Sequence, residues 1–263
     1  MIGVRLLVSV IFLLLSSFAV AAESDLDLLN SMDEGREWGA VGRLSLDNGN
    51  GFCTATLIAD DIVLTAGHCV YDKTTGALAD LTSFEFQASW RNGRAESYRG
   101  IREIAVHSQY QFADEASIDR IQFDVALLRL ETPIRNPNVT PMSLTELPKI
   151  GSTIGVVSYA KGRTEAPSVQ SRCLAAAQQN NVLVMTCDVD FGASGSPVFA
   201  TTNNGIGIVS VVSAMADMDG RPVSLGASVN PVVTDLIAKL SPTDELRSDT
   251  GGRRNTGAKF QRP

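Results

Sequence analysis

The sequence predicts an all-β protein with a single helix near its C-terminus. Short runs of apolar and β-branched residues recur along the chain, with Gly, Asn, Asp and Pro between them, and only one segment has apolar residues at helical spacing. Many short strands separated by such turns are typical of a β-barrel or a β-sandwich. The predicted strands are 40–46, 54–58, 61–65, 84–89, 101–106, 125–130, 153–159, 182–186 and 205–213.

The first 22 residues are predicted to be a secretory signal peptide. Arg5 precedes an apolar run over 6–20, and Ala19-Val20-Ala21 is a small-residue cleavage site. A membrane anchor is the alternative, but the run is shorter than the roughly 20 residues that a spanning helix needs. We therefore expect cleavage after Ala21 or Ala22, a secreted or periplasmic protein, and no membrane association after the signal is removed.

The remaining chain divides into four predicted parts. Residues 23–37 are acidic and carry no strand pattern, which suggests a propeptide or a flexible N-terminal arm. A connection at 133–141 separates an N-terminal half, 38–135, from a C-terminal half, 136–240. The second half ends in the helix at 230–240, where Pro231 suits a first helical turn. Residues 241–263 are predicted to be a disordered polar tail.

Composition limits the class of function. The chain has 263 residues and a net charge of −7, and this acidic balance argues against nucleic acid as a partner. Four cysteines in an exported chain predict two disulfides; the spacing favours Cys53 with Cys69 and Cys173 with Cys187, although three pairings are formally open. With no Cys-x-x-Cys motif and only two histidines, we expect neither a metal site nor another cofactor.

The segment 187–198 contains the candidate nucleophile, Ser194. Gly192 and Gly195 flank it, and such a turn can direct the amide N–H groups of Gly192 and Ser194 at one point, as an oxyanion hole requires. The same residue types also occur in ordinary surface turns. Ser196 competes for the role, but only Ser194 has both glycines in the matching places.

Two upstream residues are candidate partners of this serine. His68 adjoins Cys69, so a disulfide to Cys53 would hold it rigidly at a strand end, as a general base requires. Asp124 directly precedes an apolar strand, where a buried carboxylate needs a hydrogen-bond donor such as an imidazole N–H. Taken alone, the histidine is equally well explained as structural and the aspartate as a strand cap. His107 is interpreted as structural.

Together, the order His68, Asp124, Ser194 and the local sequence around each residue resemble the trypsin and chymotrypsin superfamily of serine endopeptidases. The resemblance covers about 38–240. It implies two six-stranded antiparallel β-barrels packed at right angles, with the catalytic groups in the cleft between them and a polypeptide as substrate. His68 would act as general base and then general acid, Asp124 would orient it, and Ser194 would attack the carbonyl carbon.

The resemblance also implies substrate-binding residues. Strand 207–212, with Ser210 and Val211, looks like the family's strand that pairs with the substrate backbone, and Ser210 is expected to hydrogen-bond Asp124. Gly226 resembles a wall of the specificity pocket. Phe191 is expected at the pocket mouth. Asp188 occupies the place of the buried acid that attracts Arg or Lys in trypsin-like enzymes.

The chain also departs from the trypsin pattern. Ala193 stands where animal digestive members have the aspartate that pairs with a new N-terminus, so we expect activity that does not depend on such an ion pair. Ser196 and the low disulfide number look more like the bacterial glutamyl endopeptidase-like branch. That branch has a histidine in the pocket strand, in the place taken here by Val209. We expect a monomer; a catalytically inactive binding protein on the same fold is the alternative function.

Overall fold

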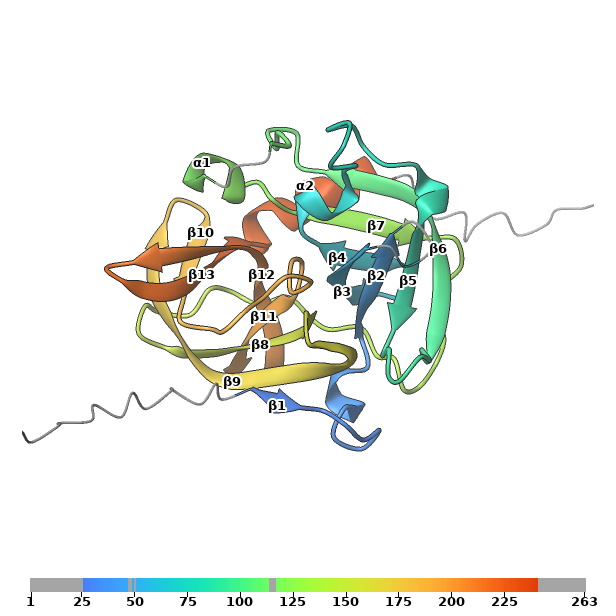
Figure 1. The fold of residues 1–263 in the computed structure, drawn as a ribbon, viewed down its shortest axis with the longest axis horizontal. Helices are drawn as coiled ribbons and strands as arrows, with labels where there is room; N and C mark the ends of the chain where they lie inside the picture. Colours follow the sequence, from blue (N-terminus) through green and yellow to red (C-terminus); the bar gives the residue numbers. More distant parts are fainter. Residues whose placement is uncertain (1–25, 47–48, 50, 114–116, 241–263) are drawn as a thin grey trace, which may run out of the picture.

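The computed structural model describes residues 26–46, 49, 51–113 and 117–240, which form two β-barrels side by side (Figure 1). The predicted signal peptide and the predicted polar tail lie outside the described residues. The all-β prediction is confirmed, because strands dominate both halves and the one long helix lies at the end of the described chain.

The first barrel is a closed ring of six antiparallel strands in the order β2-β3-β4-β7-β6-β5. Its interior is filled by aliphatic and aromatic side chains such as Leu44, Leu57 and Phe86, each fully buried. A closed ring leaves no unpaired edge and encloses these side chains completely. The strands are β2 (Val41–Leu46), β3 (Gly51–Ala59), β4 (Ile62–Thr65), β5 (Phe84–Ala88), β6 (Ser97–Val106) and β7 (Ala126–Leu130).

The second barrel uses longer and more irregular strands. They run in the order β9-β10-β13-β12-β11-β8, and a β8–β9 pairing closes the ring. Register shifts mark one bulge in β9, where it pairs with β10, and two in β12, where it pairs with β11 and with β13. Such bulges bend a strand and change the direction of the side chains that follow. The strands are β8 (Thr153–Ala160), β9 (Arg163–Gln179), β10 (Val182–Met185), β11 (Pro197–Thr202), β12 (Gly205–Met218) and β13 (Arg221–Ser228).

Every predicted strand has a counterpart in the structure, but four observed strands were not predicted: β1, β9, β11 and β13. The longest of them, β9, is rich in Ser, Gln and Ala rather than in β-branched residues. Its strand character therefore comes from pairing with β8 and β10 and not from local sequence preference.

The N-terminal segment is packed rather than loose where the structure describes it. Strand β1 (Asp27–Leu28) pairs with β9 beside Val169 and Ser168, and runs below the second barrel in Figure 1. Leu29 is buried, and a short 3-10 helix (Arg36–Trp38) buries Trp38 in the same hydrophobic cluster. The segment is thus attached to the second barrel at β1 and Leu29, while most of its other side chains are exposed. Its removal as a propeptide stays a prediction.

Two hydrophobic clusters join the barrels. In one, Trp38 and Val41 pack with Val157, Tyr159 and Phe199 of the second barrel. The other lies beneath helix α2 (Asn230–Lys239) and combines strands of both barrels with one face of the helix. The helix contacts β6 and β7, so it belongs sequentially to the second half but packs on the first barrel. Shared burial of apolar surface fixes the two barrels relative to each other.

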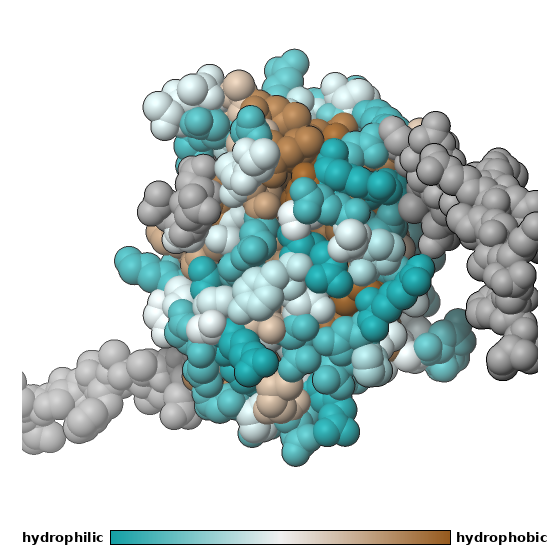
Figure 2. Space-filling view, turned by 90° about the vertical axis from the view of Figure 1, so that its right-hand side faces the viewer, coloured by the Kyte–Doolittle hydropathy of each residue, from teal (hydrophilic) through white to brown (hydrophobic). Residues whose placement is uncertain are grey.

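Both predicted disulfides are confirmed. Cys53–Cys69 connects β3 to the short 3-10 helix Gly67–Val70, and Cys173–Cys187 connects β9 to the segment that precedes the candidate nucleophile. In the described part of the chain, no helix combines the length and apolarity needed to cross a bilayer. Figure 2 shows one outer face of the molecule as mainly hydrophilic, with a hydrophobic area in its upper part.

Candidate active site

His68 and Asp124 are joined by two hydrogen bonds within the first barrel. The His68 Nδ1 atom lies 2.7 Å from Asp124 Oδ2, and the His68 backbone N–H donates to Oδ1 at 2.7 Å. The 3-10 helix Gly67–Val70 follows β4 and carries His68, while Asp124 lies two residues before β7, the strand paired with β4. Because these strands are neighbours, residues 56 positions apart in the sequence meet at one end of the barrel.

The environment of Asp124 favours its charged form. The side chain is only 4% exposed, and such burial alone raises the pKa of a carboxyl group. This burial effect on the pKa of Asp124 is outweighed by the positive charge of protonated His68 and by hydrogen bonds from His68 and Ser213, so the net pKa lies below its usual value. Asp124 can therefore remain ionised and hold His68 Nδ1 as a proton donor.

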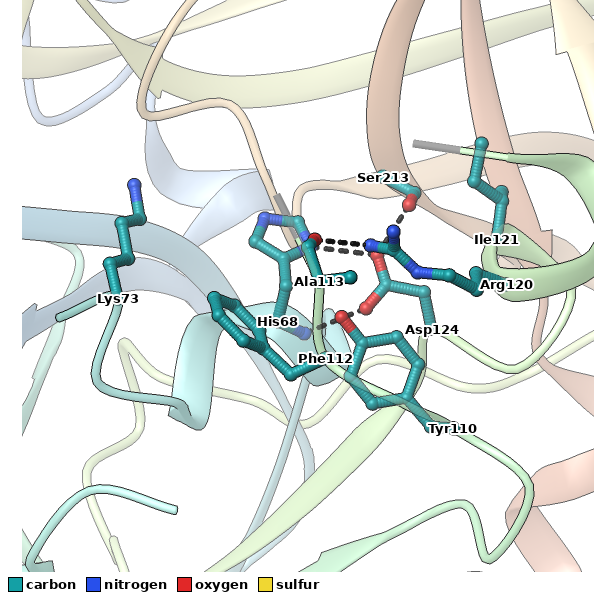
Figure 3. Close-up of a pocket in the computed structure, with 9 residues that line it drawn as sticks. All are labelled: His68, Lys73, Tyr110, Phe112, Ala113, Arg120, Ile121, Asp124 and Ser213. Atoms are coloured by element: carbon teal, nitrogen blue, oxygen red, sulfur yellow. Dashed lines mark hydrogen bonds and ion pairs between the residues drawn. The ribbon is translucent and has the colours of Figure 1, made fainter. Parts of the chain in front are cut away.

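The serine that contacts Asp124 is Ser213, not the predicted Ser210. The Ser213 hydroxyl donates to Asp124 Oδ2, and the two side chains face each other in Figure 3. Ser210 is fully buried and donates to the Ala227 carbonyl at 2.8 Å. The Ser210–Asp124 hydrogen bond that the resemblance implied is therefore wrong. Ser213 is the extra residue at a bulge between Val212 and Ala214, where the regular alternation of side chains along β12 is interrupted.

Ser194 reaches the same region from the second barrel. Together with His68, Gly192 and the Cys53–Cys69 disulfide, it lines a cleft of about 1010 Å³. Ser196 is fully buried, and its hydroxyl has no hydrogen-bond partner among the described residues. Of the two serines that the sequence left in competition, only Ser194 is in position to meet a substrate.

The backbone around Ser194 requires glycine on both sides. Gly192 has φ of +98° and Gly195 has φ of +78°, both in the left-handed region that favours glycine. A Cβ atom on Gly192 would lie 2.6 Å from the Phe52 ring, and one on Gly195 would lie 2.1 Å from Thr65 Oγ1. Both glycines therefore serve backbone conformation and close packing at once.

The amides of Gly192 and Ser194 are free to bind an oxyanion. Within the described residues, neither N–H donates to a protein acceptor, whereas the neighbouring Ala193 and Gly195 N–H groups donate to Asp190 and Val212 carbonyls. Donors left unpaired beside a candidate nucleophile are what stabilisation of a tetrahedral intermediate needs.

A second, smaller pocket of about 240 Å³ is lined by both His68 and Asp124 (Figure 3). Tyr110, Phe112 and Ile121 supply its apolar surface, and Arg120 donates from its guanidinium to the Ala113 carbonyl at 2.5 Å. Burial raises the pKa of Tyr110, so this hydroxyl stays protonated near neutral pH. None of these residues was predicted, because nothing local in the sequence distinguishes them from ordinary loop residues.

The predicted acid of the specificity pocket is not buried. Asp188 is exposed, and its backbone N–H donates to Gln170 Oε1 at 2.7 Å. Burial lowers the pKa of Arg163, and the negative charges of Asp188 and Asp190 oppose this shift in the Arg163 pKa, which shows that these acids lie near a cation of the protein itself. The expectation of a buried carboxylate was therefore wrong. Phe191 is 71% exposed and lines the cleft.

The remaining predicted binding residues lie inside the second barrel or between the barrels. Val211 is fully buried beneath α2, and Val209 is fully buried inside the second barrel. A Cβ on Gly226 would lie 2.5 Å from Ser210 Oγ and 2.8 Å from the Val211 carbonyl oxygen. A side chain at this position would therefore collide with β12, and a role for Gly226 in the specificity pocket stays a prediction.

One group of potential metal ligands lies at the site. Among the described residues, ligand atoms of Cys53, His68 and Cys69 lie within 4.8 Å of one another. The two sulfur atoms are bonded to each other, so neither is available as a thiolate. In this disulfide form the group offers only a histidine nitrogen.

Two β-barrels with a serine, a histidine and an aspartate at their junction define the class of trypsin-like proteins. The family model described as Trypsin matches residues 31–232, and the chain belongs to this family.

Individual relatives support the same assignment. A glutamyl endopeptidase from Bacillus licheniformis is 26% identical over 155 residues, which cover 59% of this chain and 47% of that protein. Phenoloxidase-activating factor 3 of Holotrichia diomphalia is 27% identical over 188 residues, which cover 58% and 52%. The chain thus spans about half the length of these curated relatives.

A solved structure of a Glu endopeptidase in complex with MPD has the same fold. Its TM-score is 0.65 at 21% identity, and the match covers 82% of this chain and 96% of that one. The predicted similarity to the glutamyl endopeptidase branch is thereby confirmed, and so is the two-barrel architecture.

Proposed function

We propose that this protein is an exported serine endopeptidase that cleaves polypeptides through an acyl-enzyme intermediate. The observation that carries the proposal is the arrangement of the bonded His68–Asp124 pair and Ser194 at one cleft. Export is supported by the N-terminal apolar segment and by two disulfides, which form in oxidising compartments.

In this mechanism, His68 Nε2 removes the proton from Ser194 Oγ as that oxygen attacks the scissile carbonyl carbon. Asp124 holds Nδ1 as a donor and stabilises the imidazolium, while the Gly192 and Ser194 amides bind the oxyanion. The imidazolium then donates its proton to the leaving amine, and the peptide C–N bond breaks. Water, activated by His68, hydrolyses the ester and restores Ser194.

The substrate backbone is proposed to pair with β12 from Ser213 onward. The β11–β12 ladder ends at the Pro197–Val211 pair, so β12 has no β11 partner beyond that point. Ser213 lines the small pocket beside Asp124, and Met215 is 48% exposed. An extended peptide could add its backbone hydrogen bonds at this free edge. The proposed segment starts three residues after the Ser210 predicted from sequence.

Preference for Arg or Lys before the scissile bond rested on a buried Asp188. Because the carboxylate is exposed and near Arg163, we do not retain this preference in the proposal. Nor does a histidine occupy the pocket strand, since the two histidines of the chain are His68 and His107. Peptide-library cleavage profiles of the wild type and of Asp188→Asn should show the same side-chain preferences. Loss of a preference for Arg or Lys in the variant would instead assign Asp188 to the specificity pocket.

The direct test of the proposed function is covalent labelling with a fluorophosphonate probe. Wild-type protein should be labelled, Ser194→Ala should not, and Ser196→Ala should be labelled if it folds, because Ser196 does not reach the cleft. Circular dichroism of each variant provides the folding control. A folded wild type that resists labelling would favour the alternative, a catalytically inactive binding protein.

A further inference from the structure

The segment 191–195, called the oxyanion loop below, lacks the carboxylate that an activation ion pair would need. Ala193, fully buried, precedes Ser194 in place of a carboxylate, so no acid at this position can pair with an amino group. Another contact must hold the Gly192 N–H in its productive orientation, since an oxyanion hole works only when its donors are already oriented.

The first such contact acts on the Phe191–Gly192 peptide. The Lys161 N–H, at the turn between β8 and β9, donates to the Phe191 carbonyl at 2.8 Å. In a trans peptide the C=O and N–H bonds point in opposite directions. Holding the Phe191 carbonyl at the β8–β9 turn therefore directs the Gly192 N–H away from that turn.

The second contact comes from Thr54 of β3, in the first barrel. This residue is fully buried; its hydroxyl accepts from the Tyr159 N–H at 3.1 Å and donates to the Gly192 carbonyl at 3.0 Å. A longer contact of 3.3 Å joins the hydroxyl to the Tyr159 carbonyl. The Thr54 N–H donates to the Ser194 carbonyl at 2.9 Å. One residue thus contacts the carbonyls at both ends of the 192–194 segment.

The β8–β9 turn is itself anchored. Arg163 donates through Nη1 to both the carbonyl and the hydroxyl oxygen of Ser158, each at 2.8 Å. Thr54 is in turn tied to β4, because its carbonyl accepts from Thr65 Oγ1 at 2.9 Å. One support, Thr54, is therefore part of a paired strand, and the other lies in a turn that side-chain hydrogen bonds anchor to β8.

We propose that Thr54 is a positioning residue whose hydroxyl holds the oxyanion loop in its active geometry, in the role that an N-terminal ion pair has in other family members. The proposal rests on the proposed function and adds how its oxyanion hole is maintained. Because the support comes from inside the folded barrels, the loop needs no new amino terminus.

The test compares Thr54→Val with the matched control Thr56→Val. Valine keeps the shape of threonine but lacks its hydroxyl, and Thr56 is also fully buried on β3, with no hydrogen-bond partner for its hydroxyl among the described residues. With p-nitrophenyl acetate as substrate, Thr54→Val should lower kcat at least about tenfold with KM within about threefold. Thr56→Val should leave both unchanged, and Thr54→Ser should restore most of kcat.

A purely structural role for Thr54 would change the melting temperature but not kcat per labelled active site. Wild-type kcat in folded Thr54→Val would therefore overturn the proposal, while failure of the wild type to react with the fluorophosphonate would instead overturn the proposed function. If Thr54→Val does not fold, a second measurement, made on the wild type, still tests the proposal. Selective carbamylation of the wild-type α-amino group should leave the labelling rate unchanged, and loss of labelling would overturn the proposal.

Discussion

The first barrel contributes the His68–Asp124 pair to the site, whereas the second contributes the Ser194 hydroxyl together with the backbone amides around it. His68 and Asp124 are joined by two direct hydrogen bonds, and a third reaches Asp124 from Ser213. The loop around Ser194 presents two amide N–H groups, and its shape depends on left-handed glycines and on contacts with the first barrel. The His68–Asp124 pair is thus formed within one barrel and receives one further hydrogen bond from the second, whereas the conformation of the loop around Ser194 depends on several contacts with both.

The largest effect on kcat is expected from removing the charge of Asp124 in the His68–Asp124 pair. Asp124→Asn keeps the shape of the residue but removes the charge that stabilises the His68 imidazolium and selects its tautomer. We expect kcat to fall about 10⁴-fold, with the fold intact. Hydrolysis of p-nitrophenyl acetate, normalised to folded protein, measures this loss. A fall of less than about tenfold would mean that Asp124 does not orient the base.

Disturbing the backbone around Gly192 should lower kcat by a smaller factor. Gly192→Ala would place a Cβ 2.6 Å from the Phe52 ring at φ of +98°, so the loop must move and the oxyanion donor is lost. We expect kcat about 100-fold to 1000-fold lower. Gly93→Ala is the control, because Gly93 also has positive φ but open space around it. Equal kcat losses in both variants would show that the loop geometry is not the cause.

A smaller effect should separate Ser213 from Ser210. Ser213→Ala removes one hydrogen bond to a buried charge, which we expect to lower kcat about tenfold. Ser210→Ala removes only the hydroxyl that donates to Ala227 and should change kcat less than about twofold. Steady-state kinetics of both variants test the assignment. A larger loss of kcat in Ser210→Ala than in Ser213→Ala would show that Ser210 is the serine that supports Asp124.

The smallest effect concerns stability at acid pH. Because the pKa of Asp124 is lowered in the folded state, its contribution to stability is present above its unfolded pKa, about 3.8, and is lost as pH falls through the folded value. Urea unfolding between pH 6 and about 3 should therefore show a steeper loss of stability for the wild type than for Asp124→Asn. Parallel curves would contradict the lowered pKa.

Much of this organisation was readable from local sequence. Alternating apolar runs and turn residues predicted the all-β class, and the terminal helix was placed at 230–240 against an observed Asn230–Lys239. Cysteine spacing predicted both disulfides. Strand β9 was missed because its small and polar residues form a strand only through the neighbours on either side.

By itself, the sequence determined which residues can carry the chemistry. Each of His68, Asp124 and Ser194 has an ordinary structural explanation when taken alone, and the three stand out because they occur together in one order with matching sequence around each. Only the tertiary structure decided which groups support them. Ser213, the extra residue of a bulge in β12, contacts Asp124 in place of the expected Ser210, and contact between the barrels brings Thr54 to Gly192, 138 residues away in the sequence. Register and long-range contact depend on the whole fold, and a local pattern does not contain them.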